Sequence, residues 1–147
     1  MNYYLFRESD KSIFYDVCPY HYLLRKNSAA TSNLNEHKLN DPIKVYKRLL
    51  EDTKNNDELY NIVLSRLAHT CVNGASRKKR NAVDFEKKHI KLCQNEIKSI
   101  KKNPSKKNFS RSLKIKILMC SYVPGIYGAI HRLYGKISGI DKKYEVR

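Results

Sequence analysis

The sequence predicts a mainly α-helical protein in which two short N-terminal strands are followed by four to five amphipathic helices. Three observations support this prediction. Apolar residues recur at helical spacing from about residue 41 onward. β-Branched and aromatic residues, which favour strands, cluster within residues 12–17 and 20–24. The composition then turns polar, and we therefore separate residues 1–31 from a basic helical region, residues 32–147.

The two predicted strands are separated by Cys18-Pro19. Pro19 has no amide hydrogen to give to a sheet, so it belongs between the strands and inside neither of them. The residues after the second strand all carry hydrogen-bond donors on their side chains: Arg25, Lys26, Asn27 and Ser28. A loop of this composition at the end of a strand is suited to binding an anion.

The first predicted helix begins at Asp41-Pro42, because Asp accepts hydrogen bonds at helix N-termini and Pro fits the first helical position. Residues 29–40 before it are polar and are predicted to form a loop. The helix is broken at residues 55–57, and its apolar face consists of Ile43, Tyr46, Leu49 and Leu50.

The second helix, about residues 57–73, carries the best apolar stripe in the chain: Leu59, Ile62, Val63, Leu67, Ala68 and Cys71. Gly74 follows it and is predicted to be a left-handed C-terminal cap. His69 lies beside the stripe, and we interpret it as a residue at the border of the core in preference to a catalytic group or metal ligand.

The third helix, about residues 82–102, has a narrow face that suits packing against one neighbour, the second helix. This face consists of Ile90, Cys93, Ile97 and Ile100. Residues 113–119 then alternate between apolar and basic residues, as a strand does. Leu113, Ile117 and Cys120 also fit the helical period, however, and we predict a helix.

After Pro124-Gly125, a last helix has aliphatic residues on one side and His131, Arg132 and Lys136 on the other. Two interpretations of the last two helices stand side by side. They either cover the core or lie flat on an anionic membrane. In the second case the membrane-facing residues are Leu113, Ile117, Ile126, Ile130, Leu133 and Ile137.

The formal net charge is +16, and residues 76–116 hold fifteen Lys or Arg against three Asp or Glu. Such a surface attracts either an anionic membrane or a nucleic acid, and charge alone does not separate the two. The four cysteines form no Cys-x-x-Cys pair, so we expect reduced thiols, no zinc site and a cytoplasmic location. No run of eighteen apolar residues that would span a bilayer is present.

Residues 11–28 carry a further pattern, formed by Lys11, Ile13, Tyr15, Pro19, Tyr20, Tyr22, Arg25 and Ser28. This order resembles the segment that closes the catalytic domain of bacterial family-2 glycosyltransferases, the GT-A type enzymes that assemble capsular and exopolysaccharides. His21 departs from the pattern, since a third tyrosine is common there. The basic, aliphatic tail around Pro124 is similar to the C-terminus of the same family.

The resemblance implies that the two strands are the remnant of a GT-A α/β sheet and that residues 1–31 end a glycosyltransferase-like catalytic domain. It also implies a substrate site. Arg25 and Ser28 would contact the diphosphate of a sugar nucleotide, with His21 assisting and Tyr22 stacking on the sugar or base. A divalent metal is expected only for a complete family member, and no cofactor is expected in this chain.

The family's nucleotide-binding sheet, its metal-binding Asp-x-Asp and its Glu-Asp pair with the catalytic base precede this segment and are absent from the sequence. We therefore expect a truncated C-terminal fragment or accessory part of a glycosyltransferase in bacterial surface polysaccharide synthesis, without sugar transfer of its own. Its expected partners are an anionic membrane, on the inner face of the cell membrane, and a missing catalytic half on another chain. The alternative is a small basic nucleic-acid-binding protein.

Overall fold

The computed structural model describes residues 8–11, 34–76 and 82–137. The chain divides into two units, Met1–Asn33 and Leu34–Arg147. In the first unit only residues 8–11 are described, so both predicted strands, residues 12–17 and 20–24, lie outside the described residues. All the described helices belong to the second unit.

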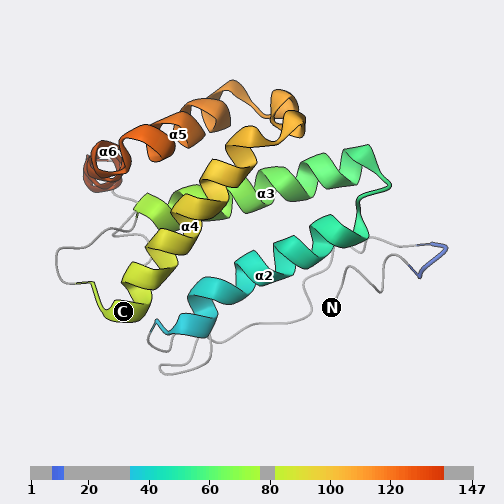
Figure 1. Ribbon diagram of the computed structural model, residues 1–147, viewed down its shortest axis with the longest axis horizontal. Helices are drawn as coiled ribbons and strands as arrows, with labels where there is room; N and C mark the ends of the chain where they lie inside the picture. The colour runs from blue at the N-terminus through green and yellow to red at the C-terminus, as the bar shows by residue number, and fades with distance from the viewer. Residues whose placement is uncertain (1–7, 12–33, 77–81, 138–147) are drawn as a thin grey trace. The chain divides into compact units, whose positions relative to one another are not determined.

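The second unit is dominated by helices, which confirms the prediction of a mainly α fold (Figure 1). Within residues 34–76 and 82–137 there is no strand, and residues 113–119 are helical as predicted. The elements in chain order are α2 (Glu36–Asp52), α3 (Asp57–Ser76), α4 (Asp84–Lys102), the 3-10 helix η1 (Pro104–Asn108), α5 (Arg111–Tyr122) and α6 (Pro124–Ile137).

Helix α2 begins at Glu36, so the predicted start at Asp41-Pro42 is wrong, and residues 36–40 are not loop. The reason is a competing cap: the side-chain oxygen of Asn35 accepts a hydrogen bond from the Lys38 backbone N–H at 2.9 Å. Pro42 lies inside the helix at an exposed position. There its missing N–H removes a single backbone hydrogen bond.

Helix α3 continues through Gly74 to Ser76, so the predicted C-terminal cap at Gly74 is wrong. Gly74 instead permits a close approach between α3 and α4. A Cβ at this position would lie 2.7 Å from His89 Nε2 and closer still to Cys93 Sγ, both on α4. Only glycine leaves room for these two side chains.

The buried face of α3 is rotated relative to the predicted stripe. Leu67, Ala68 and Cys71 are buried as predicted, whereas Leu59 and Ile62 are exposed. Their places are taken by Leu64, Val72 and Ala75. The position of α3 explains the difference. It contacts α2, α4, α5 and α6, and these four helices bury a different and wider part of its surface than the predicted stripe.

Helix α3 lies between α2 and α5, and α4 crosses it (Figure 1). The α4 packing on α3 confirms the pairing predicted from the narrow face of α4. The core is contributed by the five described α-helices and by Phe109, which follows η1. Its buried members are Ile43, Leu64, Leu67, Ala68, Cys71, Val72, Ala75, Cys93, Ile97, Ile100, Phe109, Leu113, Ile117, Cys120 and Tyr127.

Helices α5 and α6 close the described part of the chain. Ser110 caps α5, its hydroxyl accepting a hydrogen bond from Leu113 N–H at 3.3 Å. Helix α6 packs against both α5 and α3. The contact with α3 is close, since a Cβ at Gly128 would lie 3.2 Å from the Ser76 carbonyl oxygen. This packing determines which side of α6 remains uncovered.

Candidate functional site

The outer side of α5 is apolar, but not through the residues that the sequence predicts. Leu113 and Ile117 are only 1% and 4% exposed, so their prediction as membrane-facing residues is wrong. Both belong to the core, where α5 packs against α3 and α4. The exposed apolar residues of α5 are Ile115, Leu118 and Tyr122.

Helix α6 places the predicted residues on the outside. Tyr127 and Gly128 face inward and are buried. Ile126, Ile130, Leu133 and Ile137 are all exposed, the last by 79%. We call the exposed apolar residues of the two helices and their junction the α5–α6 surface: Ile115, Leu118, Tyr122, Val123, Ile126, Ile130, Leu133, Tyr134 and Ile137. Monomeric proteins seldom expose so many large apolar side chains on two adjoining helices.

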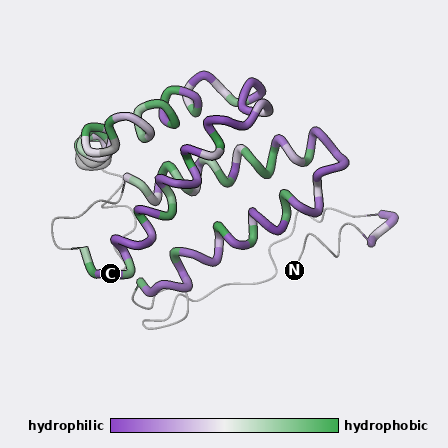
Figure 2. The backbone as a smooth tube through the Cα atoms, in the orientation of Figure 1, coloured by the Kyte–Doolittle hydropathy of each residue, from purple (hydrophilic) through white to green (hydrophobic). Residues whose placement is uncertain are grey.

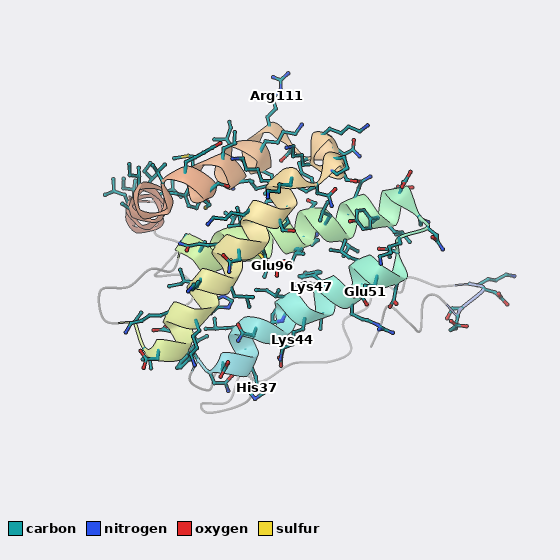
Figure 3. All side chains as sticks on the ribbon, viewed as in Figure 1. His37, Lys44, Lys47, Glu51, Glu96 and Arg111 are labelled. Carbon is teal, nitrogen blue, oxygen red and sulfur yellow. The ribbon has the colours of Figure 1, made fainter. Side chains whose placement is uncertain are left out.

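This surface lies in the most basic part of the sequence. From Ile97 to Ile140 there is no Asp or Glu, and there are ten Lys or Arg: Lys98, Lys101, Lys102, Lys106, Lys107, Arg111, Lys114, Lys116, Arg132 and Lys136. Arg111, at the start of α5, points away from the other helices (Figure 3). Figure 2 shows long hydrophobic stretches in α5 and α6, whereas α4 is mostly hydrophilic.

Several of these lysines have structural contacts as well. The Lys106 ammonium donates to the carbonyl of Lys101 at the end of α4, and Lys114 Nζ donates to the Lys107 carbonyl at 2.6 Å. Lys101 Nζ lies 3.8 Å from the centroid of the Tyr122 ring, a cation–π contact. The hydrogen bond and charge of Lys101 lower the pKa of the Tyr122 hydroxyl. Lysines of η1 and α5 are thereby held beside the apolar surface.

Where α2 meets α4, basic side chains are paired with acidic ones. Lys47 Nζ on α2 and Glu96 Oε1 on α4 are 2.7 Å apart and point toward each other (Figure 3). Within α2, Asp41 pairs with Lys44 at 3.3 Å. Acidic residues therefore neutralise much of the charge on the α2 side of the unit, and the excess of positive charge comes from α4, η1 and α5.

A buried polar chain joins α2, α3 and α4, and sequence reasoning missed it. His89 is buried, its Nδ1–H donating to Asn40 Oδ1 at 2.8 Å, and Cys93 Sγ lies 3.4 Å from His89 Nε2. A carboxamide oxygen only accepts, so Nε2 is the acceptor for the Cys93 thiol. The signal was available in the sequence, since His89 precedes Cys93, a residue of the predicted apolar face, by four residues in the same helix.

Two thiols in the described part of the chain, Cys71 and Cys120, are chemically quiet. A hydrogen bond with Cys93 and burial raise the pKa of the Cys71 thiol well above its ordinary range. Burial raises the pKa of Cys120 to about 11. Protonated thiols are poor nucleophiles and poor metal ligands. In the described part of the chain, no three His, Cys, Asp or Glu side chains are grouped so that they could hold a metal ion.

His69 is half-buried at the border of the core, as predicted. Burial, together with the charges of Lys116 and Arg66, lowers its pKa below the ordinary value of 6.5. Its imidazole is therefore neutral at pH 7. A neutral histidine that faces two cations gives no indication of acid–base catalysis in this part of the molecule.

The residues predicted for a sugar-nucleotide site, His21, Tyr22, Arg25 and Ser28, lie outside the described residues. None of the helices in residues 34–76 and 82–137 has the length and apolar character needed to cross a membrane. No protein-family model, no curated protein and no solved structure matches this chain.

Proposed function

We propose that this chain is the C-terminal part of a family-2 glycosyltransferase of bacterial surface polysaccharide synthesis, and that its helical region docks it on an anionic membrane. The observation that supports docking most directly is the α5–α6 surface: nine exposed apolar residues in a segment with ten cations and no acid. The glycosyltransferase assignment is supported by the residue pattern from Lys11 to Ser28.

The energetics favour such docking. A Lys or Arg close to an anionic lipid surface contributes about 1 kcal/mol, and full burial of an Ile or Leu side chain contributes about 1.5–3 kcal/mol. A few of each exceed what a single short acyl anchor provides. The α5–α6 surface offers both kinds of group on neighbouring helices, so the membrane need not alter the fold to reach them.

The first experiment compares sedimentation of the full chain with vesicles of phosphatidylglycerol and phosphatidylcholine against sedimentation with pure phosphatidylcholine. We expect binding to the anionic vesicles only, weakened by salt. Leu133→Asp, at a position that is 64% exposed, should reduce binding at least tenfold without loss of helicity. Leu59→Asp is the matched control, because Leu59 is also an exposed leucine but lies in the first turn of α3.

Equal losses in Leu133→Asp and Leu59→Asp would show that negative charge alone weakens binding, and would contradict docking through the α5–α6 surface. Binding to neutral vesicles as tight as to anionic ones would contradict the role of the lysines.

A nucleic-acid-binding function is the second candidate, and α4 favours it. The exposed side of α4 carries a row of lysines: Lys87, Lys88, Lys91, Lys98 and Lys102. Among the described ion pairs, one involves this row, the pair of Lys87 with Asp84. A salt titration against generic single-stranded RNA tests it, since log K falls with log salt roughly in proportion to the phosphates neutralised. Tight RNA binding combined with indifference to vesicles would replace the membrane proposal.

The glycosyltransferase assignment has its own test. We expect an Asp-x-Asp and a Glu-Asp pair to be encoded upstream of this chain, either in the same gene or in a neighbouring one. Co-production of that product with this chain should yield sugar transfer that either part alone lacks. Arg25→Gln should abolish the restored transfer, whereas Lys26→Gln, which removes a neighbouring charge, should retain most of it. Transfer unaffected by Arg25→Gln would contradict the assigned role.

A further inference from the structure

A pocket of about 320 Å³ lies where the end of α4, η1 and α5 meet. Its apolar lining comes from Phe109, Ile117 and Leu118. Four lysines complete the lining: Lys101, Lys106, Lys107 and Lys114. The volume is at the lower end of the range for small-molecule sites, which suits a small ligand or one end of a larger one.

The local sequence explains why this hollow forms. The side chain of Asn103 accepts from Ser105 N–H at 2.9 Å and starts η1, which turns the chain between α4 and α5. Phe109 then anchors the turn in the core and is only 6% exposed. The turn leaves the last residues of α4 beside the first turns of α5, and the pocket is the space between them.

Two of the four ammonium groups are held in place. Lys106 Nζ donates to the Lys101 carbonyl, and Lys114 Nζ donates to the Lys107 carbonyl at 2.6 Å. Each ammonium carries three donors, so each retains donors for a ligand. Lys101 is positioned by its contact with the Tyr122 ring. No acidic residue lines the pocket, and none occurs between Ile97 and Ile140.

This combination restricts the chemistry of the ligand. An apolar lining offers no hydrogen bonds to water or to a bare inorganic anion, but it accepts an alkyl chain. Four ammonium groups attract an anion and repel a ligand that brings its own cation. The ligand that satisfies both parts is an amphiphile whose anionic group precedes an alkyl chain.

We propose that this pocket binds one anionic phospholipid molecule, with its phosphate on the four lysines and the adjoining part of its acyl region on Phe109, Ile117 and Leu118. The proposal deepens the proposed membrane docking and rests on it for the source of the ligand. Leu118 belongs to both the pocket and the α5–α6 surface, and Lys101 contacts both, so a lipid in the pocket would be continuous with a docked bilayer.

The test uses monomeric lipids, which separates the pocket from the membrane. The ¹⁵N-labelled full chain is titrated with dihexanoyl phosphatidylglycerol below its micelle concentration, with dihexanoyl phosphatidylcholine and with inorganic phosphate. We expect saturable amide shifts at Phe109 and Leu118 with the anionic lipid. Both other probes should bind at least tenfold more weakly, since each lacks either the net charge or the chain.

Amino-acid substitutions then test which residues bind the lipid. The double variant Lys101→Gln, Lys107→Gln should weaken the anionic lipid at least tenfold. The matched control is Lys88→Gln, Lys91→Gln, which removes the same charge from exposed positions of α4 outside the pocket and should change affinity less than threefold. Leu118→Asp, at a half-exposed residue of the pocket, should also abolish the shifts.

The outcomes distinguish the pocket from the docking surface. Leu133→Asp should lose vesicle binding yet bind monomeric phosphatidylglycerol normally, because Leu133 does not line the pocket. A wild-type chain that binds the monomer at Phe109 but ignores vesicles would support the pocket and contradict docking. Equal affinity for phosphate and lipid, equal losses in the two double variants, or shifts confined to α6 would overturn the pocket proposal.

Discussion

Helices α4 and α6 are both amphipathic, yet they use their faces in opposite ways. Helix α4 buries His89, Cys93, Ile97 and Ile100 against its neighbours and turns lysines to solvent. Among the α6 residues whose burial is described, Tyr127 and Gly128 are buried and a row of aliphatic side chains is exposed. The apolar face of α4 is therefore used in packing within the unit, whereas the apolar residues Ile126, Ile130, Leu133 and Ile137 of α6 are exposed.

The difference has a physical cause. Helix α4 lies against α2, α3 and α5, and these contacts bury Cys93, Ile97 and Ile100, whereas Ile90 of the predicted face is only half-buried. Helix α6 is the last of the described helices and packs on α5 and the end of α3, where Gly128 draws it close. Burial of an exposed isoleucine recovers transfer free energy, so the uncovered side of α6 is where the proposed membrane docking would add most stabilisation.

The largest contrast is expected from one substitution on each helix. Ile97→Ala removes three carbons from a side chain with 0% exposure and should lower the free energy of unfolding by about 2–5 kcal/mol, because the core cannot fully close around the cavity. Ile130→Ala, on the exposed side of α6, should change it by less than about 0.5 kcal/mol. Urea denaturation followed by circular dichroism measures both. Similar losses would mean that α6 is as deeply packed as α4.

Substitutions of two glycines test how closely other atoms approach the backbone in the two regions. Gly74→Ala should cost roughly 1–3 kcal/mol, because its Cβ would meet His89 Nε2 and Cys93 Sγ in a packed core. Gly125→Ala, in the first turn of α6, has no atom within 4 Å of the added Cβ and should be neutral or stabilising. The same denaturation experiment applies. A stable Gly74→Ala variant would show that α3 and α4 separate easily.

A smaller effect is expected from the charges that tie α4 to α2. Glu96→Gln removes the partner of Lys47 at a largely buried carboxylate and should cost about 0.5–1 kcal/mol, less in high salt. Asp41→Asn breaks an exposed pair within one helix and should cost no more than about 0.3 kcal/mol. Thermal unfolding at low and high salt measures the pair. A salt-independent loss in Glu96→Gln would point to packing and not to charge.

The smallest effect concerns the basic side of the unit. The folded state lowers the pKa of His69, so near pH 6.5 and below the unfolded state binds more protons than the folded state. Stability should therefore fall as the pH decreases from 7.5 to 5.5, and His69→Gln should reduce that fall. Lys116→Gln should reduce it as well, since Lys116 is one cause of the shift. An unchanged pH dependence in both variants would show that other groups control it.

Part of the fold was readable from local sequence. The helical class, a break between the first two helices and the helix over 113–119 all follow from spacing and turn residues, although the break lies at residues 53–56 and not at the predicted 55–57. The helix boundaries near Asn35 and Gly74 could not be predicted from local sequence. Asn35 and Asp41 both satisfy the rule for an N-cap, and Gly74 satisfies the rule for a C-terminal cap but instead allows α3 to approach α4 closely.

The α5–α6 surface was likewise predictable only in part from the sequence. The sequence by itself determined that the helical region contains two consecutive basic, apolar segments, and that no acid occurs from Ile97 to Ile140. Only the tertiary structure decided which apolar side of α5 meets the core, because Leu113-Ile117 and Ile115-Leu118 lie on different sides of one helix and both are apolar. Spacing identifies the sides of a helix, but burial depends on where α3 and α4 lie, and those contacts join residues far apart in the chain.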